Sequence, residues 1–287
     1  MRIQHTIYIS LFFMSLHLMA NEALRIMPLG DSITAGYTDN PPWAHPFEYG
    51  YRAPLYTLLT EANISFKFVG QSAEPMNKKF GDPTHGGTVF PKIDLKKLNQ
   101  DGHRGYGGWS IPAINKNIAQ WMKEDKPDII LLHIGINGIN PKSPQQLDAL
   151  VNTIYQTDKR VKLIVGQITP YSTYKQLMFD YNTFIRQELV PKYQKQGRTI
   201  LTVDQYKHFL VNPQDPKSID KKGLSNGINH PTNKLYEKMA QSWFQGINIL
   251  LKKPRILSSN TRIKTISLQS LTWKREKQWK NYYSLRL

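Results

Sequence analysis

Short apolar runs alternate with longer amphipathic segments along residues 21–251. Residues 128–134 (DIILLHI) form a continuous apolar run, which is typical of a central parallel strand buried on both faces. Ile111, Ile114 and Ile118 recur at helical spacing, which predicts a helix. The whole pattern predicts strands at residues 24–29, 66–70, 128–134, 162–168 and 199–203, and helices at residues 51–62, 111–122, 147–155, 180–190 and 233–251.

Strands and helices that alternate about five times imply an α/β fold, with a parallel sheet between two layers of helices. In such sheets, ligands bind beyond the carboxyl ends of the strands. Residues 30–32 and 135–137 fall at two of these ends, so we expect a functional site built from these two loops.

Residues 71–108 depart from this pattern. They show no clear element and contain many Gly, Pro and polar residues. A loop of this length within a domain is usually functional or mobile.

The absence of cysteine from the 287 residues excludes disulfides, thiolate catalysis and cysteine metal sites. The histidines lack the His-Glu-x-x-His spacing or a comparable one, so we expect no metal site. Neither a dinucleotide fingerprint nor a phosphate loop is present, so no cofactor is expected. His133 lies within the central apolar run and is expected to be a hydrogen-bonded core residue.

Residues 1–20 have the pattern of a secretory signal peptide. Arg2 supplies a positive charge, residues 7–19 are largely apolar, and residues 18–20 (LMA) resemble a small-residue cleavage site. The alternatives are a buried first strand or a retained anchor. No later run is long and apolar enough to span a bilayer. We therefore expect a mature chain from Asn21 without stable membrane insertion, secreted or periplasmic.

The net charge of +17 is concentrated at the C-terminus, because residues 252–287 contain ten Lys or Arg and one Glu. This basic extension, which we expect to be poorly ordered, is predicted either to be solvated or to contact an anionic polymer or cell surface. It also lies beyond the last predicted helix and can represent sequence past the natural end of the domain. Since the chain is expected to be exported, we expect no nucleic-acid partner.

Ser32 is the first candidate for chemistry. It follows the first predicted strand directly, where a tight turn can expose its hydroxyl at the N-terminus of a helix. A serine becomes nucleophilic when a base, usually a histidine, takes its proton. A serine after Gly30 and Asp31 is equally suited to cap a helix. The local sequence leaves both roles open.

Four sequence blocks in a fixed order extend this hypothesis. They are Gly30-Asp31-Ser32-Ile33, Gly105-Tyr106-Gly107-Gly108-Trp109-Ser110, Gly135-Ile136-Asn137-Gly138 and Asn226-Gly227-Ile228-Asn229-His230-Pro231. Together they resemble the four blocks of the SGNH, or GDSL-type, hydrolases, a family of serine esterases. The resemblance spans nearly all of the expected mature domain, residues 21–251, and implies a three-layer, flavodoxin-like α/β/α fold.

The resemblance implies a role for each matching residue. Ser32 would be the nucleophile and His230 the base that activates it. The Gly108 amide and the Asn137 side chain, together with the Ser32 amide, would stabilise the oxyanion of the tetrahedral intermediate. Donors of this kind are each worth about 3–4 kcal/mol of the barrier.

The last block departs from the family at the triad acid. The family usually carries an aspartate three or four residues before the histidine, where this chain has Asn226 and Gly227. Asn226 can accept a hydrogen bond from the ring but brings no negative charge, and it can hold the wrong tautomer. Asp204 or Asp220 are the alternatives for the acid. A catalytically impaired enzyme, or one that relies on a dyad, therefore stays open.

The second block is closest to that of secreted carbohydrate acetylesterases, which implies a small O-acetyl ester, of a small molecule or a polysaccharide, as substrate. Four aromatic residues, Trp43, Phe47, Tyr49 and Tyr51, are expected either to stack on sugar or to pack the loop. A lysophospholipase or other lipid esterase is the alternative enzyme. A carbohydrate-binding protein that kept the fold but lost activity is the alternative outside enzymes.

Overall fold

The computed structural model describes residues 22–38, 47–74 and 92–252. The expected signal peptide, Trp43 and the basic extension beyond Lys252 lie outside the described residues, and so these expectations stay predictions.

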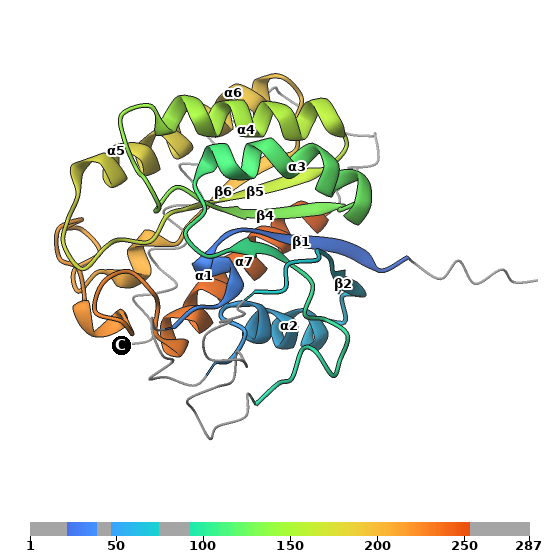
Figure 1. Cartoon of the computed structure of the whole chain (residues 1–287), viewed down its shortest axis with the longest axis horizontal. Helices are drawn as coiled ribbons and strands as arrows, with labels where there is room; N and C mark the ends of the chain where they lie inside the picture. Colours follow the sequence, from blue (N-terminus) through green and yellow to red (C-terminus); the bar gives the residue numbers. More distant parts are fainter. Residues whose placement is uncertain (1–21, 39–46, 75–91, 253–287) are drawn as a thin grey trace, which may run out of the picture. The chain divides into compact units, whose positions relative to one another are not determined.

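A parallel sheet forms the centre of the described chain, as the sequence predicts (Figure 1). Its five main strands run in the order β2-β1-β4-β5-β6, and every paired neighbour is parallel. This is the flavodoxin-like order, in which β2 lies on one side of β1 and the later strands follow on its other side. The strands are β1 (Leu24–Asp31), β2 (Phe66–Phe68), β4 (Ile129–His133), β5 (Lys162–Gln167) and β6 (Ile200–Asp204).

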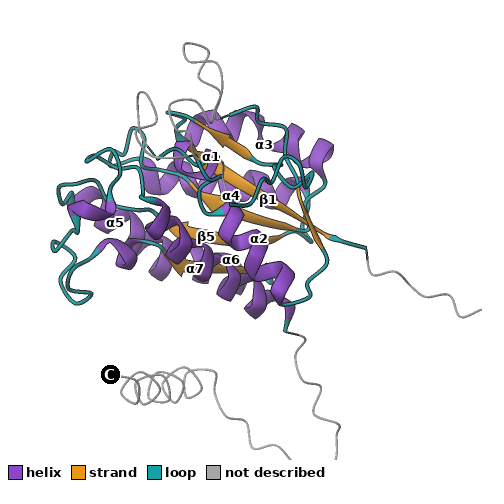
Figure 2. Ribbon diagram, turned by 90° about the horizontal axis from the view of Figure 1, so that it is seen from below, coloured by secondary structure: helices purple, strands orange, loops and turns teal. Residues whose placement is uncertain are grey.

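Helices cover both faces of this sheet. In Figure 1, α3 and α4 lie above the strands, and α2 and α7 lie below them. Figure 2 shows the layers from below. All five residues of β4 are buried between the two layers, as the apolar run predicts. The helices are α1 (Ser32–Ala35), α2 (Arg52–Glu61), α3 (Ile111–Asp125), α4 (Ser143–Thr157), α5 (Gln176–Phe184), α6 (Val190–Lys195) and α7 (Asn233–Leu251).

The helix predicted at residues 180–190 is longer and is interrupted. Helices α5 and α6 are joined by a π-helical turn, η1 (Ile185–Leu189). Pro191 stands at the start of α6 and has no N–H to donate to the preceding turn. A wider turn before it accommodates this break.

The expectation that residues 71–108 contain no element was wrong, because Arg104–Tyr106 forms a short strand, β3. It pairs in parallel with the end of β1 and places Gly105 beside Gly30. A Cβ atom on Gly105 would lie 2.5 Å from the Ala35 amide nitrogen. The strand therefore depends on tertiary contact with β1 and α1, which a pattern of three residues cannot reveal.

His133, the last residue of β4, is buried as expected, but the prediction that it is hydrogen bonded was wrong. Neither of its ring nitrogens has a hydrogen-bond partner among the described residues. Burial lowers the pKa of His133 to about 4, so the ring is neutral at physiological pH.

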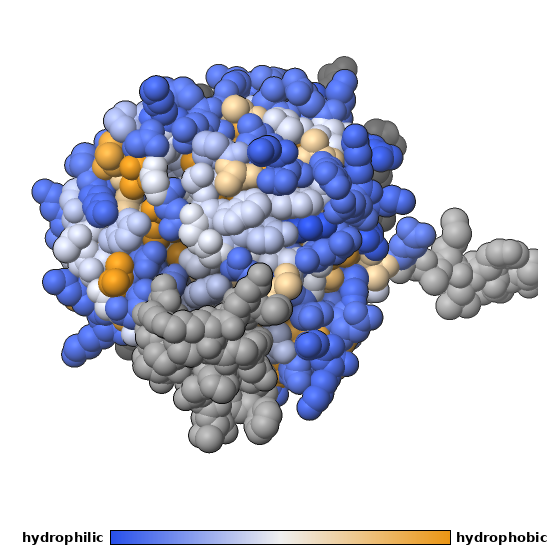
Figure 3. All heavy atoms as spheres, in the orientation of Figure 1, coloured by the Kyte–Doolittle hydropathy of each residue, from blue (hydrophilic) through white to orange (hydrophobic). Residues whose placement is uncertain are grey.

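The surface in Figure 3 is largely hydrophilic, with apolar residues exposed in small groups. Within the part of the chain that the structure describes, no helix combines the length and hydrophobicity required to cross a membrane. Val211 and Ile228 are among the large apolar side chains that remain exposed.

Candidate active site

Ser32 stands where β1 ends and α1 begins, at the carboxyl end of the sheet. The Asp31 side chain caps this helix by accepting a hydrogen bond from the Ile33 amide at 3.0 Å. Gly30 allows the turn to pass close to β4, because a Cβ atom there would lie 2.0 Å from the His133 carbonyl oxygen. Capping by Asp31 leaves the Ser32 hydroxyl for another role.

That hydroxyl faces His230. The Ser32 Oγ atom lies 3.0 Å from His230 Nε2, although the two residues are 198 positions apart in the chain. Both side chains are buried. His230 lies just before α7, in a loop closed by a bridge between Leu224 and Pro231. The structure therefore brings the expected nucleophile and base together.

Asn226 contacts the second nitrogen of the His230 ring, Nδ1. Its Oδ1 atom accepts hydrogen bonds from the amides of Ile228, Asn229 and His230, at 2.9–3.0 Å. Its Nδ2 atom lies 3.2 Å from Asn229 Oδ1 and 3.0 Å from His230 Nδ1. Three backbone donors fix the orientation of the amide, since a flipped amide would set its NH2 group against them.

This orientation determines the tautomer of His230. An amide NH2 group only donates, so Nδ1 of the ring accepts and the proton of the neutral ring sits on Nε2. The Nε2–H group then donates to Ser32 Oγ. A general base requires the opposite tautomer, with a free lone pair on Nε2. The expectation that Asn226 can accept from the ring was wrong, because its acceptor oxygen is taken by the backbone.

The two aspartates considered as substitutes serve other purposes. Asp204 accepts a hydrogen bond from the Lys207 amide, and Asp220 accepts one from the Lys222 amide. Asn226, and neither aspartate, contacts Nδ1 of His230.

Gly108 and Asn137 line the same cleft as Ser32 and His230, a hollow of about 570 Å³. Gly108 has a φ of 77°, a left-handed conformation that glycine adopts without strain. One N–H of the Asn137 side chain donates to the Trp109 carbonyl at 3.1 Å, which orients the amide and leaves its second N–H for a ligand. Gly108 and Asn137, two of the three predicted oxyanion donors, thus line the cleft beside Ser32, the third.

Glu74 and Tyr37 also line the cleft, and the sequence interpretation missed both. The Tyr37 hydroxyl donates to Glu74 Oε2 at 3.2 Å, and the Gly107 amide donates to the same oxygen. The Tyr37 ring lies 5.6 Å from the His230 ring, centre to centre. Tyr37 follows Ser32 closely enough to be suspected, whereas Glu74 lies in the segment without periodicity and gives no signal.

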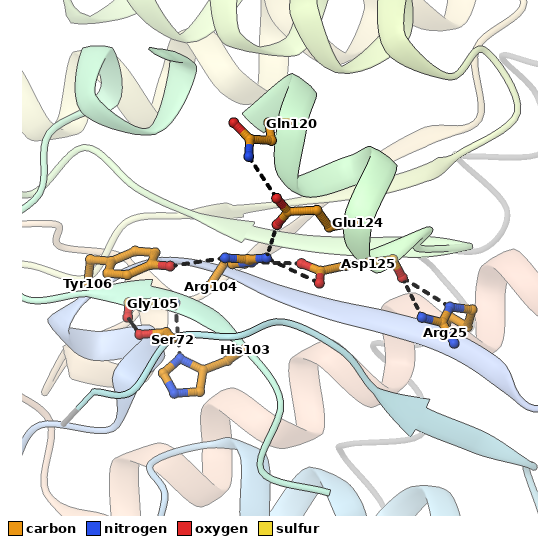
Figure 4. Close-up of polar contacts among 9 residues, drawn as sticks. All are labelled: Arg25, Ser72, His103, Arg104, Gly105, Tyr106, Gln120, Glu124 and Asp125. Atoms are coloured by element: carbon orange, nitrogen blue, oxygen red, sulfur yellow. Dashed lines mark hydrogen bonds and ion pairs between the residues drawn. The ribbon is translucent and has the colours of Figure 1, made fainter. Parts of the chain in front are cut away.

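A buried ion pair supports β3 behind this cleft (Figure 4). Arg104 Nε donates to Asp125 at 2.7 Å, and its Nη2 donates to Glu124 at 2.8 Å. The guanidinium also lies over the Trp121 ring. These contacts tie β3 to the end of α3, and therefore fix the strand that leads into Gly107 and Gly108.

Asp31 carries an unusual carboxyl beneath the nucleophile. Burial raises its pKa to about 7, although a hydrogen bond from the Ile33 amide acts in the opposite direction. Its Oδ2 atom is buried and has no partner among the described residues. The described residues contain no group of three or more His, Cys, Asp or Glu side chains that could hold a metal ion.

The described chain is thus an α/β fold with a parallel sheet between helices, in which Ser32 at the end of the first strand contacts His230 just before the last helix. The sequence profile of the family described as GDSL-like Lipase/Acylhydrolase matches residues 26–243. The chain belongs to this family, and its fold is the SGNH hydrolase fold that the sequence predicts.

Two individual proteins are similar to this chain over 80% of its length. The chain is 26% identical over 262 residues to a multidomain esterase of Ruminococcus flavefaciens, covering 80% of this chain and 29% of that protein. It therefore spans less than a third of that relative's length. A family 3 carbohydrate esterase of Clostridium thermocellum is 27% identical, with a TM-score of 0.57 over 80% of this chain and 98% of that one.

A third relative supports the fold alone. The structure of a carbohydrate esterase family 3 protein from Talaromyces cellulolyticus is 22% identical, with a TM-score of 0.55 over 80% of this chain and 100% of that one.

Proposed function

We propose that this protein is a carboxylic ester hydrolase that removes small acyl groups, above all O-acetyl groups, from a carbohydrate. The contact of 3.0 Å between Ser32 Oγ and His230 Nε2 carries the proposal. It lies in a cleft that Gly108 and Asn137 also line. Membership of a family of acylhydrolases supports the same reaction.

The reaction proceeds through an acyl-enzyme. Ser32 Oγ attacks the acyl carbon while its proton passes to His230 Nε2, and the carbonyl oxygen becomes an oxyanion. N–H groups of Gly108, Asn137 and Ser32 stabilise this oxyanion. The intermediate collapses to an ester on Ser32, and the alcohol leaves with the proton from His230. Water then cleaves that ester with the same base, and the acid is released.

The character of the cleft favours a carbohydrate ester over a lipid. Its lining is predominantly polar, and Ile228 is its one large aliphatic side chain among the described residues. A long acyl chain needs an apolar surface to leave water, at about 25 cal/mol for each Å². The name of one relative, a family 3 carbohydrate esterase, agrees with this choice.

Asn226 makes the enzyme slow under this proposal. When His230 takes the serine proton, Nδ1 must carry a hydrogen, and that hydrogen meets the NH2 group of Asn226. Asn226 therefore offers the imidazolium no acceptor at Nδ1, the position at which an aspartate would. We therefore expect a turnover well below that of an enzyme with an aspartate at this position.

Hydrolysis of p-nitrophenyl acetate by the purified protein and by the Ser32→Ala variant tests the proposal. We expect release of p-nitrophenol by the first and the buffer rate for the second. Equal rates would refute an enzyme that uses Ser32 and favour a carbohydrate-binding protein. A preference for p-nitrophenyl palmitate over the acetate would favour a lipid esterase.

We also propose that the protein is exported, on the pattern of residues 1–20. The N-terminal sequence of the protein recovered outside the cytoplasm tests this, since cleavage should leave Asn21 as the first residue. A protein that retains Met1 would contradict it.

A further inference from the structure

We propose that Glu74 selects the alcohol side of the substrate, by accepting a hydrogen bond from a free sugar hydroxyl next to the ester. The inference rests on the proposed function and names a residue that binds the carbohydrate. Glu74 lines the cleft together with Ser32 and His230.

The two carboxylate oxygens of Glu74 differ in their surroundings. Oε2 accepts from the Tyr37 hydroxyl and from the Gly107 amide. Oε1 makes no hydrogen bond with any described residue. It also does not belong to the buried side-chain oxygens that are left without a partner, so it is not sealed inside the protein. It is therefore an accessible acceptor on a side chain whose other oxygen is anchored.

The backbone around Glu74 is held against β3, which keeps the carboxylate in place. Ser72 Oγ donates to the Gly105 carbonyl at 2.7 Å, a contact visible in Figure 4. The Glu74 amide donates to Ser72 Oγ, and a ring nitrogen of His103 lies 2.7 Å from the Glu74 carbonyl oxygen. His103 Nδ1 accepts from the Gly105 amide, so its other nitrogen donates to Glu74. Binding a ligand here costs little ordering of the site.

The chemistry of this oxygen identifies its ligand as a hydroxyl donor. A carboxylate only accepts hydrogen bonds, and bonds to a charged acceptor are stronger than neutral ones. Free hydroxyls of a partly acetylated sugar are such donors, and they lie next to the acetyl group on the ring. A fully acetylated sugar has no hydroxyl to offer. A phosphate near the ester would be repelled by the negative charge.

The test compares monoacetylated xylobiose with fully acetylated xylobiose in the native protein, in Glu74→Gln and in Glu188→Gln. Glutamine keeps an oxygen for Gly107 and Tyr37 but loses the charge and one acceptor. Glu188 is exposed and does not line the cleft, so its variant controls for the change in net charge. We expect the ratio of kcat/KM for the monoacetylated over the fully acetylated sugar to fall about tenfold in Glu74→Gln alone.

A purely structural role for Glu74 would lower both rates together and leave the ratio unchanged, which would overturn the inference. Calorimetric titration of monoacetylated xylobiose into Ser32→Ala, with and without Glu74→Gln, tests it independently of turnover. We expect the affinity to drop about tenfold in the double variant. If the native protein hydrolyses no ester, the proposed function fails, and equal affinities in this titration would still refute the role of Glu74.

Discussion

Replacing Asn226 by aspartate should activate the enzyme. In the observed geometry, one oxygen of the new carboxylate accepts the three backbone hydrogen bonds that Asn226 Oδ1 accepts in the native protein. The other oxygen takes the place of Nδ2, 3.0 Å from His230 Nδ1. The ring then donates from Nδ1 and presents the lone pair of Nε2 to Ser32. No other backbone contact has to change.

The size of the gain follows from the change at His230 Nδ1. The bond from Asn226 Nδ2 to Asn229 Oδ1 is also lost, and the Asn229 amide has to turn its NH2 group toward the new oxygen. A charge-assisted bond from the imidazolium to a carboxylate is worth about 1.5–3 kcal/mol. Removing the Asn226 NH2 group, which faces the Nδ1–H group of protonated His230, adds about 1 kcal/mol. The total of about 3 kcal/mol corresponds to roughly a 100-fold increase in kcat. The loss of about 10⁴-fold that the reverse change causes in a serine protease triad sets the upper bound.

The assay is the kcat for p-nitrophenyl acetate, measured beside the Asn229→Asp variant. That control adds the same charge one contact away, and its oxygen still accepts from Asn226 Nδ2 without reaching Nδ1. Nuclear magnetic resonance supplies a second readout. A strongly deshielded Nδ1–H proton of His230 should appear in Asn226→Asp and be absent from the native protein.

Two results would refute this reasoning. An unchanged or lower kcat in Asn226→Asp, with the fold intact, would mean that the acid function comes from another residue. Equal activation by Asn229→Asp would mean that general electrostatics, rather than the tautomer of His230, limits the reaction.

Two further predictions concern the oxyanion site and the buried acid. Asn137→Ala should lower kcat about 10²–10³-fold with a small change in KM, because the N–H group acts on charge that develops in the transition state; a loss in KM alone would contradict this role. Asp31→Asn should remove a pH-dependent loss of stability. Burial raises the pKa of Asp31 from 3.8 to about 7, so the folded protein holds a proton that the unfolded chain releases. Stability from this group is complete below about pH 4 and is lost as the pH rises toward 7. Urea unfolding at pH 5 and pH 8 should show the native protein losing about 3 kcal/mol more than Asp31→Asn between the two. A parallel loss in both proteins would exclude Asp31 as the source.

The sheet and its helices could be predicted from the sequence because their signals are local. The apolar run at residues 128–134 and the helical spacing after Ile111 each require burial on a known face, and the structure bears both out. Strand β3 could not be predicted in this way. It has three residues, one of them Gly105, and it exists because Gly30 and Ala35 lie beside it.

The residues of the candidate site show the same difference between local sequence signals and tertiary contacts. Ser32, Gly108, Asn137 and His230 belong to blocks whose residue types are set by chemistry, so a resemblance in sequence was enough to propose them. Glu74 belongs to no such block and reaches the cleft through contacts of Ser72 and His103 with β3.

Asn226 shows why the identity of a residue does not determine its role. At the sequence level, an amide beside a histidine can accept or donate, and accepting would leave the base in its active tautomer. The choice is made by three backbone amides, those of Ile228, Asn229 and His230, which bind the only acceptor that the side chain has. An aspartate in the same turn would satisfy these amides and still have an oxygen for the ring. The backbone of the turn therefore accommodates either residue, and we expect the main penalty for asparagine to fall on proton transfer at His230.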